Sequence, residues 1–206
     1  MLINIRGTNG SGKTTLAREF IAPNAETLTL FEYTDDKGRL KPVKGTLSEI
    51  DGKRYMVIGS YERPQGGLDG ISTFALQMDA IRAATNVGTY AKDYGVNHVI
   101  FEGIMCATTF GAWGNFMLGA RDMGLQPMVA YLSTPLNVCL ERIKERQKRA
   151  GKEREIKTDL VQNKIKMIDS TRRKFEALGI PVCVLGCDFP LVELKQAALN
   201  FYGERL

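Results

Sequence analysis

Histidine is almost absent from this chain, because His98 is the only one among 206 residues. A single histidine excludes the multi-histidine metal centres and leaves no pair of imidazoles for acid–base catalysis. His98 opens an apolar run, so we expect it to have a structural role.

Cysteine is scarce as well, and the four cysteines are scattered: Cys106, Cys139, Cys183 and Cys187. Neither a histidine nor a second cysteine pair lies near the last two to complete a zinc site, so we expect reduced, buried thiols in a cytoplasmic protein. Long apolar runs are also missing, which argues against a membrane span, and we expect no signal peptide because the chain enters a strand pattern directly.

The bulk composition is that of an ordinary globular protein, with 44% hydrophobic and 25% charged residues. This length predicts one domain over residues 1–206. The net charge of +5 is unevenly spread, because residues 141–157 hold eight basic and four acidic residues, a net +4. Such a block can be a solvated helix face, a phosphate clamp or a nucleic-acid patch.

Residues 7–14 read G-T-N-G-S-G-K-T, which matches the phosphate-binding P-loop pattern G-x-x-x-x-G-K-[ST]. An apolar, strand-like run precedes them and a helical pattern follows, as a P-loop requires. Backbone N–H groups and the helix N-terminus would hold the ATP phosphates. Lys13 would reach the β- and γ-phosphates, and the Thr14 hydroxyl would ligate Mg²⁺. The predicted nucleotide-binding residues are Thr8, Asn9, Gly10, Ser11, Gly12, Lys13, Thr14 and Thr15.

Alternating strand and helix patterns predict an α/β fold of the P-loop kinase type. We expect a three-layer, doubly wound sheet of five parallel strands with crossover helices on both faces. Asp51-Gly52 between two extended runs predicts a β-hairpin near residues 46–61, inserted at the rim of the sheet. The core strands are predicted at residues 1–6, 27–33, 98–101, 127–133 and 181–185, an irregular stretch at 34–45, and helices at 14–22, 71–94, 108–123, 136–149, 159–178 and 191–202.

Glu102 directly follows the apolar strand pattern of residues 99–101. Ligands sit at the carboxyl ends of strands in such sheets, so Glu102 is a candidate to hold Mg²⁺ or its water shell, or to accept a proton. The simpler alternative is a carboxylate that caps the next helix or pairs with a lysine.

Three arginines in the basic segment, Arg142, Arg146 and Arg149, are spaced to share one helical face. The flexible residues 150–152 follow, and together they predict a lid over residues 141–157 that closes on the triphosphate. Arg142 and Arg146 are the leading candidates for stabilising the transferred charge. The alternative is a solvated basic helix.

A polar, glycine-rich loop at residues 61–70 ends a predicted insertion over residues 34–70. Such loops often bind the second substrate. Asp69 is either a helix cap or the general base for an acceptor hydroxyl. Asp35 and Asp36 are rival bases, although a turn explains them more simply. The predicted substrate-binding residues are Tyr61, Glu62, Arg63, Gly66, Gly67 and Asp69.

Four stretches of the chain resemble a group of small bacteriophage P-loop kinases: residues 3–15, 61–71, 100–103 and 132–146. This group includes the phage DNA kinases that phosphorylate 5-hydroxymethyluracil in DNA before hypermodification of the base, and its members are often described as thymidylate-kinase-like. The resemblance implies ATP as donor, a hydroxymethyl group on a pyrimidine as acceptor, and action in the host cytoplasm. It also favours functional roles for Asp69 and Glu102. Leu68 departs from the group, in which this position is commonly cysteine.

Three functions remain open from the sequence. A kinase acting on DNA would use the basic segment to contact phosphates, with Lys148, Lys152 and Lys157 better placed for DNA than for ATP, and would reach or extrude the modified base. A kinase for free deoxynucleoside monophosphates would use the arginines for ATP and acceptor phosphate only. A non-catalytic ATP-binding protein would not require Lys13, Thr14, Glu102 and the arginines together.

Overall fold

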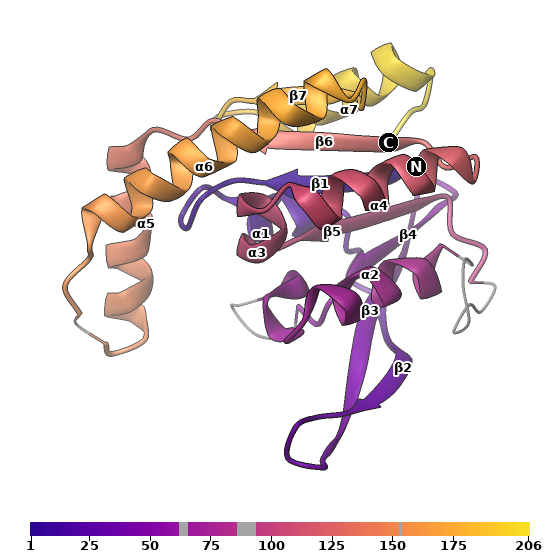
Figure 1. Cartoon of the computed structure of the whole chain (residues 1–206), viewed down its shortest axis with the longest axis horizontal. Helices are drawn as coiled ribbons and strands as arrows, with labels where there is room; N and C mark the ends of the chain where they lie inside the picture. Colours follow the sequence, from indigo (N-terminus) through magenta and orange to yellow (C-terminus); the bar gives the residue numbers. More distant parts are fainter. Residues whose placement is uncertain (62–65, 86–93, 153) are drawn as a thin grey trace.

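The computed structural model describes residues 1–61, 66–85, 94–152 and 154–206 (Figure 1). These residues form a seven-stranded sheet in the order β2-β3-β4-β5-β1-β6-β7. The five strands β4-β5-β1-β6-β7 are parallel to their neighbours, whereas β3 is antiparallel to both of its neighbours, β2 and β4. The strands are β1 (Leu2–Arg6), β2 (Glu26–Thr34), β3 (Leu40–Ile50), β4 (Lys53–Ile58), β5 (His98–Glu102), β6 (Pro127–Leu132) and β7 (Val182–Leu185).

Helices cover both faces of this sheet, which confirms the predicted three-layer, doubly wound α/β architecture (Figure 1). One hydrophobic core lies between the sheet and α2, α3, α4 and α6, and a second lies between the sheet and α1 and α7. Successive residues of β1 face opposite cores, as strand geometry requires. The helices are α1 (Lys13–Arg18), α2 (Phe74–Ala84), α3 (Ile104–Thr108), α4 (Gly111–Asp122), α5 (Leu136–Arg149), α6 (Thr158–Ala177) and α7 (Pro190–Tyr202), with a 3₁₀ turn η1 (Gly67–Gly70).

Five parallel strands are present as predicted, but the second of them was wrongly assigned. Residues 27–33 belong to β2, the outermost antiparallel strand, and the core strand beside β5 is β4. The Asp51-Gly52 hairpin is confirmed, since both residues have positive φ (52° and 74°) and Ile50 pairs with Lys53. This hairpin is not an insertion, because β4 is part of the parallel core; the added strands are β2 and β3.

The predicted irregular stretch over residues 34–45 was also wrong in its second half, where β3 already begins at Leu40. Pro42 and Gly45 interrupt the strand pattern there, which hid the strand from sequence reading. The predicted helix over residues 108–123 corresponds to α4, which begins at Gly111, and the short helix α3 before it was not predicted. Helix α2 begins only at Phe74, after Thr73 caps it, and residues 86–93 of the predicted helix lie outside the described residues.

Two parts of the molecule project from the sheet in Figure 1. One is the β2–β3 hairpin, and the other is the arm formed by α5 and the beginning of α6. In the part of the chain that the structure describes, no helix combines the length and the apolarity needed to cross a bilayer.

Candidate functional site

The P-loop connects the central strand β1 to α1 and packs against α5. Gly10 (φ 78°) and Gly12 (φ 99°) adopt the left-handed conformation that favours glycine. A Cβ atom at Gly10 would lie 2.4 Å from the carbonyl oxygen of Cys139, so α5 leaves no room for a side chain. The Thr134 hydroxyl donates to the Ser11 carbonyl at 2.8 Å and fixes the loop from the other side.

Several polar side chains of the P-loop are buried. One of them donates a hydrogen bond to the backbone of the loop, and others have no hydrogen-bond partner among the described residues. Lys13 Nζ donates to the carbonyl of Thr8 at 3.0 Å. The hydroxyls of Thr8 and Ser11 are buried without a hydrogen-bond partner among the described residues. Buried polar groups are normally paired, so this arrangement indicates a loop built to receive a polar ligand.

Thr14 and Glu102 meet at the carboxyl ends of the two central strands. β1 and β5 are parallel neighbours with Ile5 opposite Glu102, and this register brings the strand end beside the first turn of α1. Thr14 Oγ1 donates to Glu102 Oε1 at 2.9 Å. The prediction that Glu102 lies beside the P-loop is therefore confirmed in position.

The electrostatics of Lys13 and Glu102 are set by their burial. Glu102 is 1% exposed, and burial raises the pKa of its carboxyl, while Lys13 and the Thr14 hydrogen bond oppose this rise. Burial likewise lowers the pKa of Lys13, and Glu102 opposes that shift. Each group is the charged neighbour that most opposes the other's pKa shift, so the two form an electrostatic pair at the P-loop.

Asp69 reaches the same corner of the molecule from the turn η1. Its Oδ1 atom accepts the backbone N–H of Ile104 at 2.7 Å, at the start of α3 and two residues after Glu102. Gly67 lies against Glu102, because a Cβ atom there would be 2.6 Å from Glu102 Oε1. Asp69 does not cap the helix that follows its own loop, because Thr73 caps α2. It bonds instead to the first residue of α3, which holds the Asp69 carboxylate beside the Glu102–Ile104 turn.

Gln77 supports η1 and was missed by the sequence analysis. This fully buried residue of α2 donates from Nε2 to the carbonyls of Leu68 at 3.1 Å and Ile71 at 3.0 Å. The two carbonyls flank Asp69 along the chain, so one amide group holds both sides of the turn. A lone glutamine among the apolar residues of a helix was the only available sign.

The loop at residues 61–70 is described except for residues 62–65. Gly66 packs on the ring of Tyr61, where a Cβ atom would lie 2.6 Å from ring carbons. The Tyr61 hydroxyl is buried without a hydrogen-bond partner among the described residues, and burial together with the charge of Glu102 raises its pKa well above 10. Glu62 and Arg63 lie outside the described residues.

The arginines of α5 differ in their distance from the P-loop. Arg142 Nη1 donates to the Gly10 carbonyl at 3.5 Å, so this residue lies beside the phosphate loop. Arg146 is exposed one turn further along α5 and makes no contact of this kind with a described residue, and Arg149 pairs with Glu145 at 3.5 Å on the surface. Of the predicted P-loop residues, Thr15 is exposed and Asn9 half-buried.

Asp35 and Asp36 lie away from this site, at the turn of the β2–β3 hairpin (Figure 1). The Asp35 carboxylate accepts the N–H groups of Lys37 and Arg39 and pairs with the Arg39 guanidinium at 2.7 Å. The expectation that Asp35 could rival Asp69 as the base is corrected, and the turn interpretation holds.

A buried arginine at the end of β1 was also missed. Arg6 is 0% exposed and donates to the carbonyls of Thr109 (3.1 Å) and Ala107 (3.4 Å), with its guanidinium 4.4 Å from the Phe175 ring centroid. With its amide oxygen turned toward Arg6, Asn4 accepts from Nε and Nη2 at 3.1 Å each. These contacts join the strand that carries the P-loop to the α3–α4 connection and α6.

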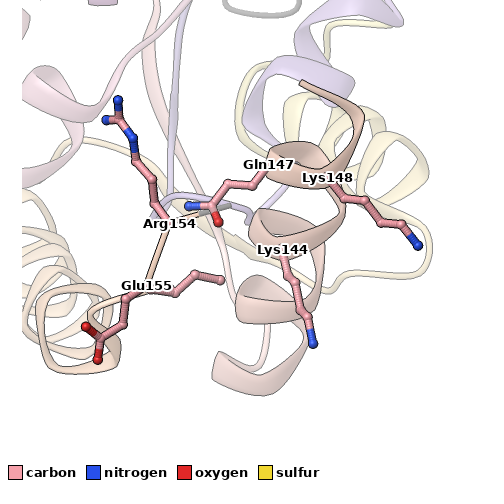
Figure 2. Close-up of a pocket in the computed structure, with 6 residues that line it drawn as sticks. Lys144, Gln147, Lys148, Arg154 and Glu155 are labelled. Atoms are coloured by element: carbon pink, nitrogen blue, oxygen red, sulfur yellow. The ribbon is translucent and has the colours of Figure 1, made fainter. Parts of the chain in front are cut away.

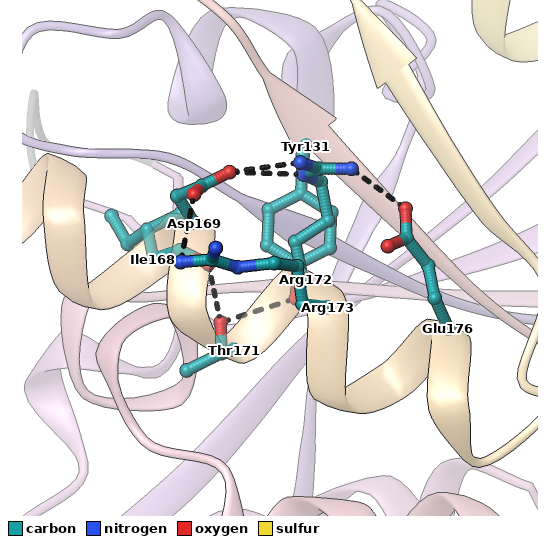
Figure 3. Close-up of polar contacts among 7 residues, drawn as sticks. All are labelled: Tyr131, Ile168, Asp169, Thr171, Arg172, Arg173 and Glu176. Carbon is teal, nitrogen blue, oxygen red and sulfur yellow. Dashed lines mark hydrogen bonds and ion pairs between the residues drawn. The ribbon is translucent and has the colours of Figure 1, made fainter.

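A second set of polar contacts lies on α6, on the side of the sheet that Arg6 faces (Figure 3). Thr171 shares a hydrogen bond of 3.1 Å with the Tyr131 hydroxyl and accepts from Arg6 at 3.3 Å. On the outer side of α6, Arg172 pairs with Asp169 at 3.0 Å and with Glu176 at 2.7 Å. The Thr171–Tyr131 bond fixes α6 against β6, and the ion pairs of Arg172 lie within α6. None of these contacts reaches the P-loop, so we interpret them as structural.

The P-loop after the central strand, the parallel core order β4-β5-β1-β6-β7 and the acid at the end of β5 define a P-loop kinase. A family described as 5-hmdU DNA kinase matches residues 1–187. The chain belongs to this 5-hmdU DNA kinase family.

Individual relatives agree with this assignment. The 5-hmdU DNA kinase of Pseudomonas phage M6 is 34% identical over 200 residues, which cover 96% of this chain and 97% of that protein. The 5-hmdU DNA kinase of Pseudomonas phage PaMx11 is 26% identical over 196 residues, 95% of each chain. The match to the 5-hmdU DNA kinase of Bacillus phage SP10, 26% identical, covers 87% of this chain but only 26% of that protein.

Among solved structures, a deoxyadenosine kinase from M. mycoides with bound dATP aligns over 97% of this chain at 16% identity, with a TM-score of 0.40. The strand order and the P-loop, not this likeness, establish the fold.

Proposed function

We propose that this protein transfers the γ-phosphoryl group of ATP to the hydroxymethyl oxygen of 5-hydroxymethyluracil in DNA, a step in thymidine hypermodification. The observation that carries the proposal is the cluster of Lys13, Thr14 and Glu102 at the P-loop of a chain that belongs to the 5-hmdU DNA kinase family. The relatives come from bacteriophages, so we place the reaction in the cytoplasm of the infected host.

Charge on the transferred group would be balanced from two sides. Lys13 would turn from the Thr8 carbonyl to the β- and γ-phosphates, and Arg142, already beside Gly10, would approach from α5 with Arg146 behind it. The proposed lid over residues 141–157 would then close on the triphosphate and exclude water.

The oxygen atoms of Thr14 and Glu102 fit a magnesium site. They are adjacent hard donors, and in the described part of the chain no group of three or more His, Cys, Asp or Glu side chains could hold a metal alone. Mg²⁺ is usually held by one or two carboxylates together with substrate phosphates, which matches this limited donor set. When bound, the ion would neutralise charge on the β- and γ-phosphates.

Asp69 is the proposed general base. Its Oδ1 atom is fixed by the Ile104 N–H, which leaves Oδ2 to accept the hydroxymethyl proton. As the O–H bond breaks, the hydroxymethyl oxygen forms a bond to the γ-phosphorus, and the bond from phosphorus to the departing ADP oxygen breaks. The modified nucleobase must reach the Asp69 carboxylate either from the major groove of the DNA or from outside the double helix. We therefore infer that the nucleobase is extruded or that the acceptor DNA is single-stranded.

The test supplies ATP labelled in the γ-phosphate to three acceptors: DNA containing 5-hydroxymethyluracil, the same DNA with thymine, and a panel of deoxynucleoside monophosphates. We expect label in the first acceptor only. Lys13→Ala should reduce transfer by roughly 10²–10³-fold, the loss typical of one preorganised charge, while Lys195→Ala on α7 should not. Label in the monophosphates instead would establish a free-nucleotide kinase, and normal transfer by folded Lys13→Ala would exclude the proposed site.

A further inference from the structure

Helix α5 carries positive charge on two different faces. Successive residues of a helix are about 100° apart, so Lys144 and Lys148 lie well over a quarter turn from the face that holds Arg142, Arg146 and Arg149. The Arg142 face contacts the P-loop at Gly10. The face with Lys144 and Lys148 therefore points away from the P-loop, so nucleotide binding does not account for its charge.

This second face lines a groove of about 480 Å³ between α5 and the segment that leads to α6 (Figure 2). Its walls contain three cations and one carboxylate. The residues that line the groove are Lys144, Gln147, Lys148, Arg154, Glu155 and Ile156.

The backbone at the end of α5 builds this groove. Gly151 has φ 62°, Lys152 donates its N–H to the Gln147 carbonyl at 3.0 Å, and Gly151 donates to the Lys148 carbonyl at 3.1 Å. These are the two hydrogen bonds of a Schellman turn, which reverses the chain so that it runs back along α5. Ile156 then packs into the small apolar cluster between α5 and α6, which fixes the returning segment and brings Arg154 beside the helix.

The cations of the groove are unpaired. Within the described part of the chain, Lys144, Lys148 and Arg154 make no ion pair or hydrogen bond through their side chains, whereas Arg149 on the other face pairs with Glu145. The charged ends of Lys144, Lys148 and Arg154 extend outward from the groove in Figure 2, so they form a positively charged rim that attracts a polyanion. Phosphodiester contacts of this kind position a nucleic acid without reading its sequence.

We propose that this groove, which we call the α5 groove, holds phosphodiester groups of the acceptor DNA at a distance from the modified base. The inference rests on the proposed function and adds where the polynucleotide runs, namely over the face of α5 opposite the ATP side. It also refines the sequence expectation for DNA contacts, because Lys148 lines the groove and Lys152 and Lys157 do not.

The test compares three full-length proteins: wild type, the groove variant Lys144→Ala/Lys148→Ala/Arg154→Ala, and a control with the same charge loss, Arg121→Ala/Lys195→Ala/Arg205→Ala. The control residues belong to α4, α7 and the C-terminal segment, away from α5 in Figure 1. Binding of a long single-stranded oligonucleotide is followed by fluorescence anisotropy over a salt series. Phosphate transfer is measured with the long oligonucleotide and with a trinucleotide, each carrying one 5-hydroxymethyluracil.

The groove variant should flatten the plot of log Kd against log[salt] by up to about two units, since each lost phosphate contact on a single strand contributes about 0.7. Its KM for the long acceptor should rise, while kcat, the KM for ATP and transfer to the trinucleotide stay at wild-type values. The control variant should keep the wild-type slope.

An unchanged slope in the groove variant, or an equal change in the control, would overturn the α5 groove, as would a wild type that binds no DNA at low salt. DNA binding that depends on the groove without any transfer to hydroxymethyluracil would support the groove and refute the proposed function. If the groove variant transfers phosphate to the long acceptor as well as the wild type does, the result would support the proposed function and overturn the α5 groove.

Discussion

The Thr14 hydroxyl donates a hydrogen bond to the Glu102 carboxylate at 2.9 Å, although the two residues lie 88 positions apart in the chain. Thr14 belongs to the first turn of α1 and Glu102 ends β5, so the contact connects the phosphate loop to the neighbouring strand of the sheet. The fold therefore places side by side the two oxygen atoms that we propose as magnesium ligands.

Replacing Glu102 by glutamine should raise the magnesium concentration that gives half-maximal transfer by at least roughly 10–100-fold, the loss seen when even an outer-shell partner of a metal site is changed. Glutamine retains an oxygen that can accept the Thr14 hydrogen bond, so the fold should persist. A magnesium titration of kcat checks this, with Glu19→Gln, an exposed residue at the end of α1, as the control. Superimposed titrations for wild type and Glu102→Gln would remove Glu102 from the metal site.

Asp69→Asn and Asp69→Ala separate the two roles of Asp69. Asparagine still offers an oxygen to the Ile104 N–H, so the melting temperature of Asp69→Asn should remain near wild type, whereas Asp69→Ala should lose the stability of the cap, about 1 kcal/mol. If Asp69 is the base, both variants should lose about 10²–10⁴-fold in kcat with little change in ATP affinity. Full activity in Asp69→Asn with loss only in Asp69→Ala would leave Asp69 as a cap.

Gln77→Met should lower kcat without raising the KM for ATP, because the turn that carries Asp69 loses both amide hydrogen bonds while the P-loop is untouched. The Leu68 carbonyl would keep the Ile71 N–H at 2.9 Å, whereas the Ile71 carbonyl would lose the Gln77 donor, at a cost of about 1–3 kcal/mol if it is left unsatisfied. Initial-rate kinetics well below the melting temperature, together with thermal denaturation, make the measurement. Gln196→Met on the surface of α7 is the matched control, and a Gln77→Met protein with a lower melting temperature but normal kcat would limit Gln77 to a structural role.

His98 makes the protein less stable in mild acid. Burial, the adjacent N-terminal ammonium group and Lys53 lower its pKa from 6.5 to about 4. The unfolded chain therefore binds more protons than the folded one between pH 6.5 and 4, so this stability is fully present above pH 6.5 and is lost as the pH falls through 4. The shift is worth up to about 3 kcal/mol.

Urea denaturation of wild type and His98→Gln at pH 7.5 and pH 5 measures this loss. Other groups titrate in the same range, but they are common to both proteins, and no other histidine contributes. The unfolding free energy of the wild type, relative to that of His98→Gln, should be lower at pH 5 than at pH 7.5. A constant gap at both pH values would mean that His98 keeps an ordinary pKa in the folded state.

Local patterns predicted most of the strands and helices because burial in a parallel sheet makes a strand continuously apolar. The N-terminal strand and residues 98–101 and 127–133 show this clearly, and each is a fully buried core strand. The sequence could not show that β4, and not residues 27–33, is the parallel core strand. Both segments are extended and apolar enough for a core strand. Only pairing across the sheet, Tyr55 opposite His98, decides which one joins the parallel strands.

In the candidate site as well, residues marked by local spacing could be predicted, and residues that act through distant partners could not. A P-loop is recognisable because its spacing is a property of adjacent residues, and Glu102 is recognisable because it ends an apolar strand. Gln77 and Arg6 act through carbonyls that lie elsewhere in the sequence or in the fold, and no spacing marks such partners. Whether Asp69 caps a helix could not be decided either, since the N–H that it accepts belongs to Ile104 of another element.

The central place of β1 in the sheet has a consequence for how the protein is made. Leu2 pairs with Val99 on one side and with Pro127 on the other, whereas β2, β3 and β4 are joined by short turns. Contacts between residues far apart in sequence form late, because the intervening loop must first be closed. The β2–β4 meander can therefore form early on the ribosome, while the strand that carries the phosphate loop is fully paired only after β6, which ends at Leu132, has been synthesised. A nascent chain that stops before β6 should bind no nucleotide, even though the whole P-loop has been translated.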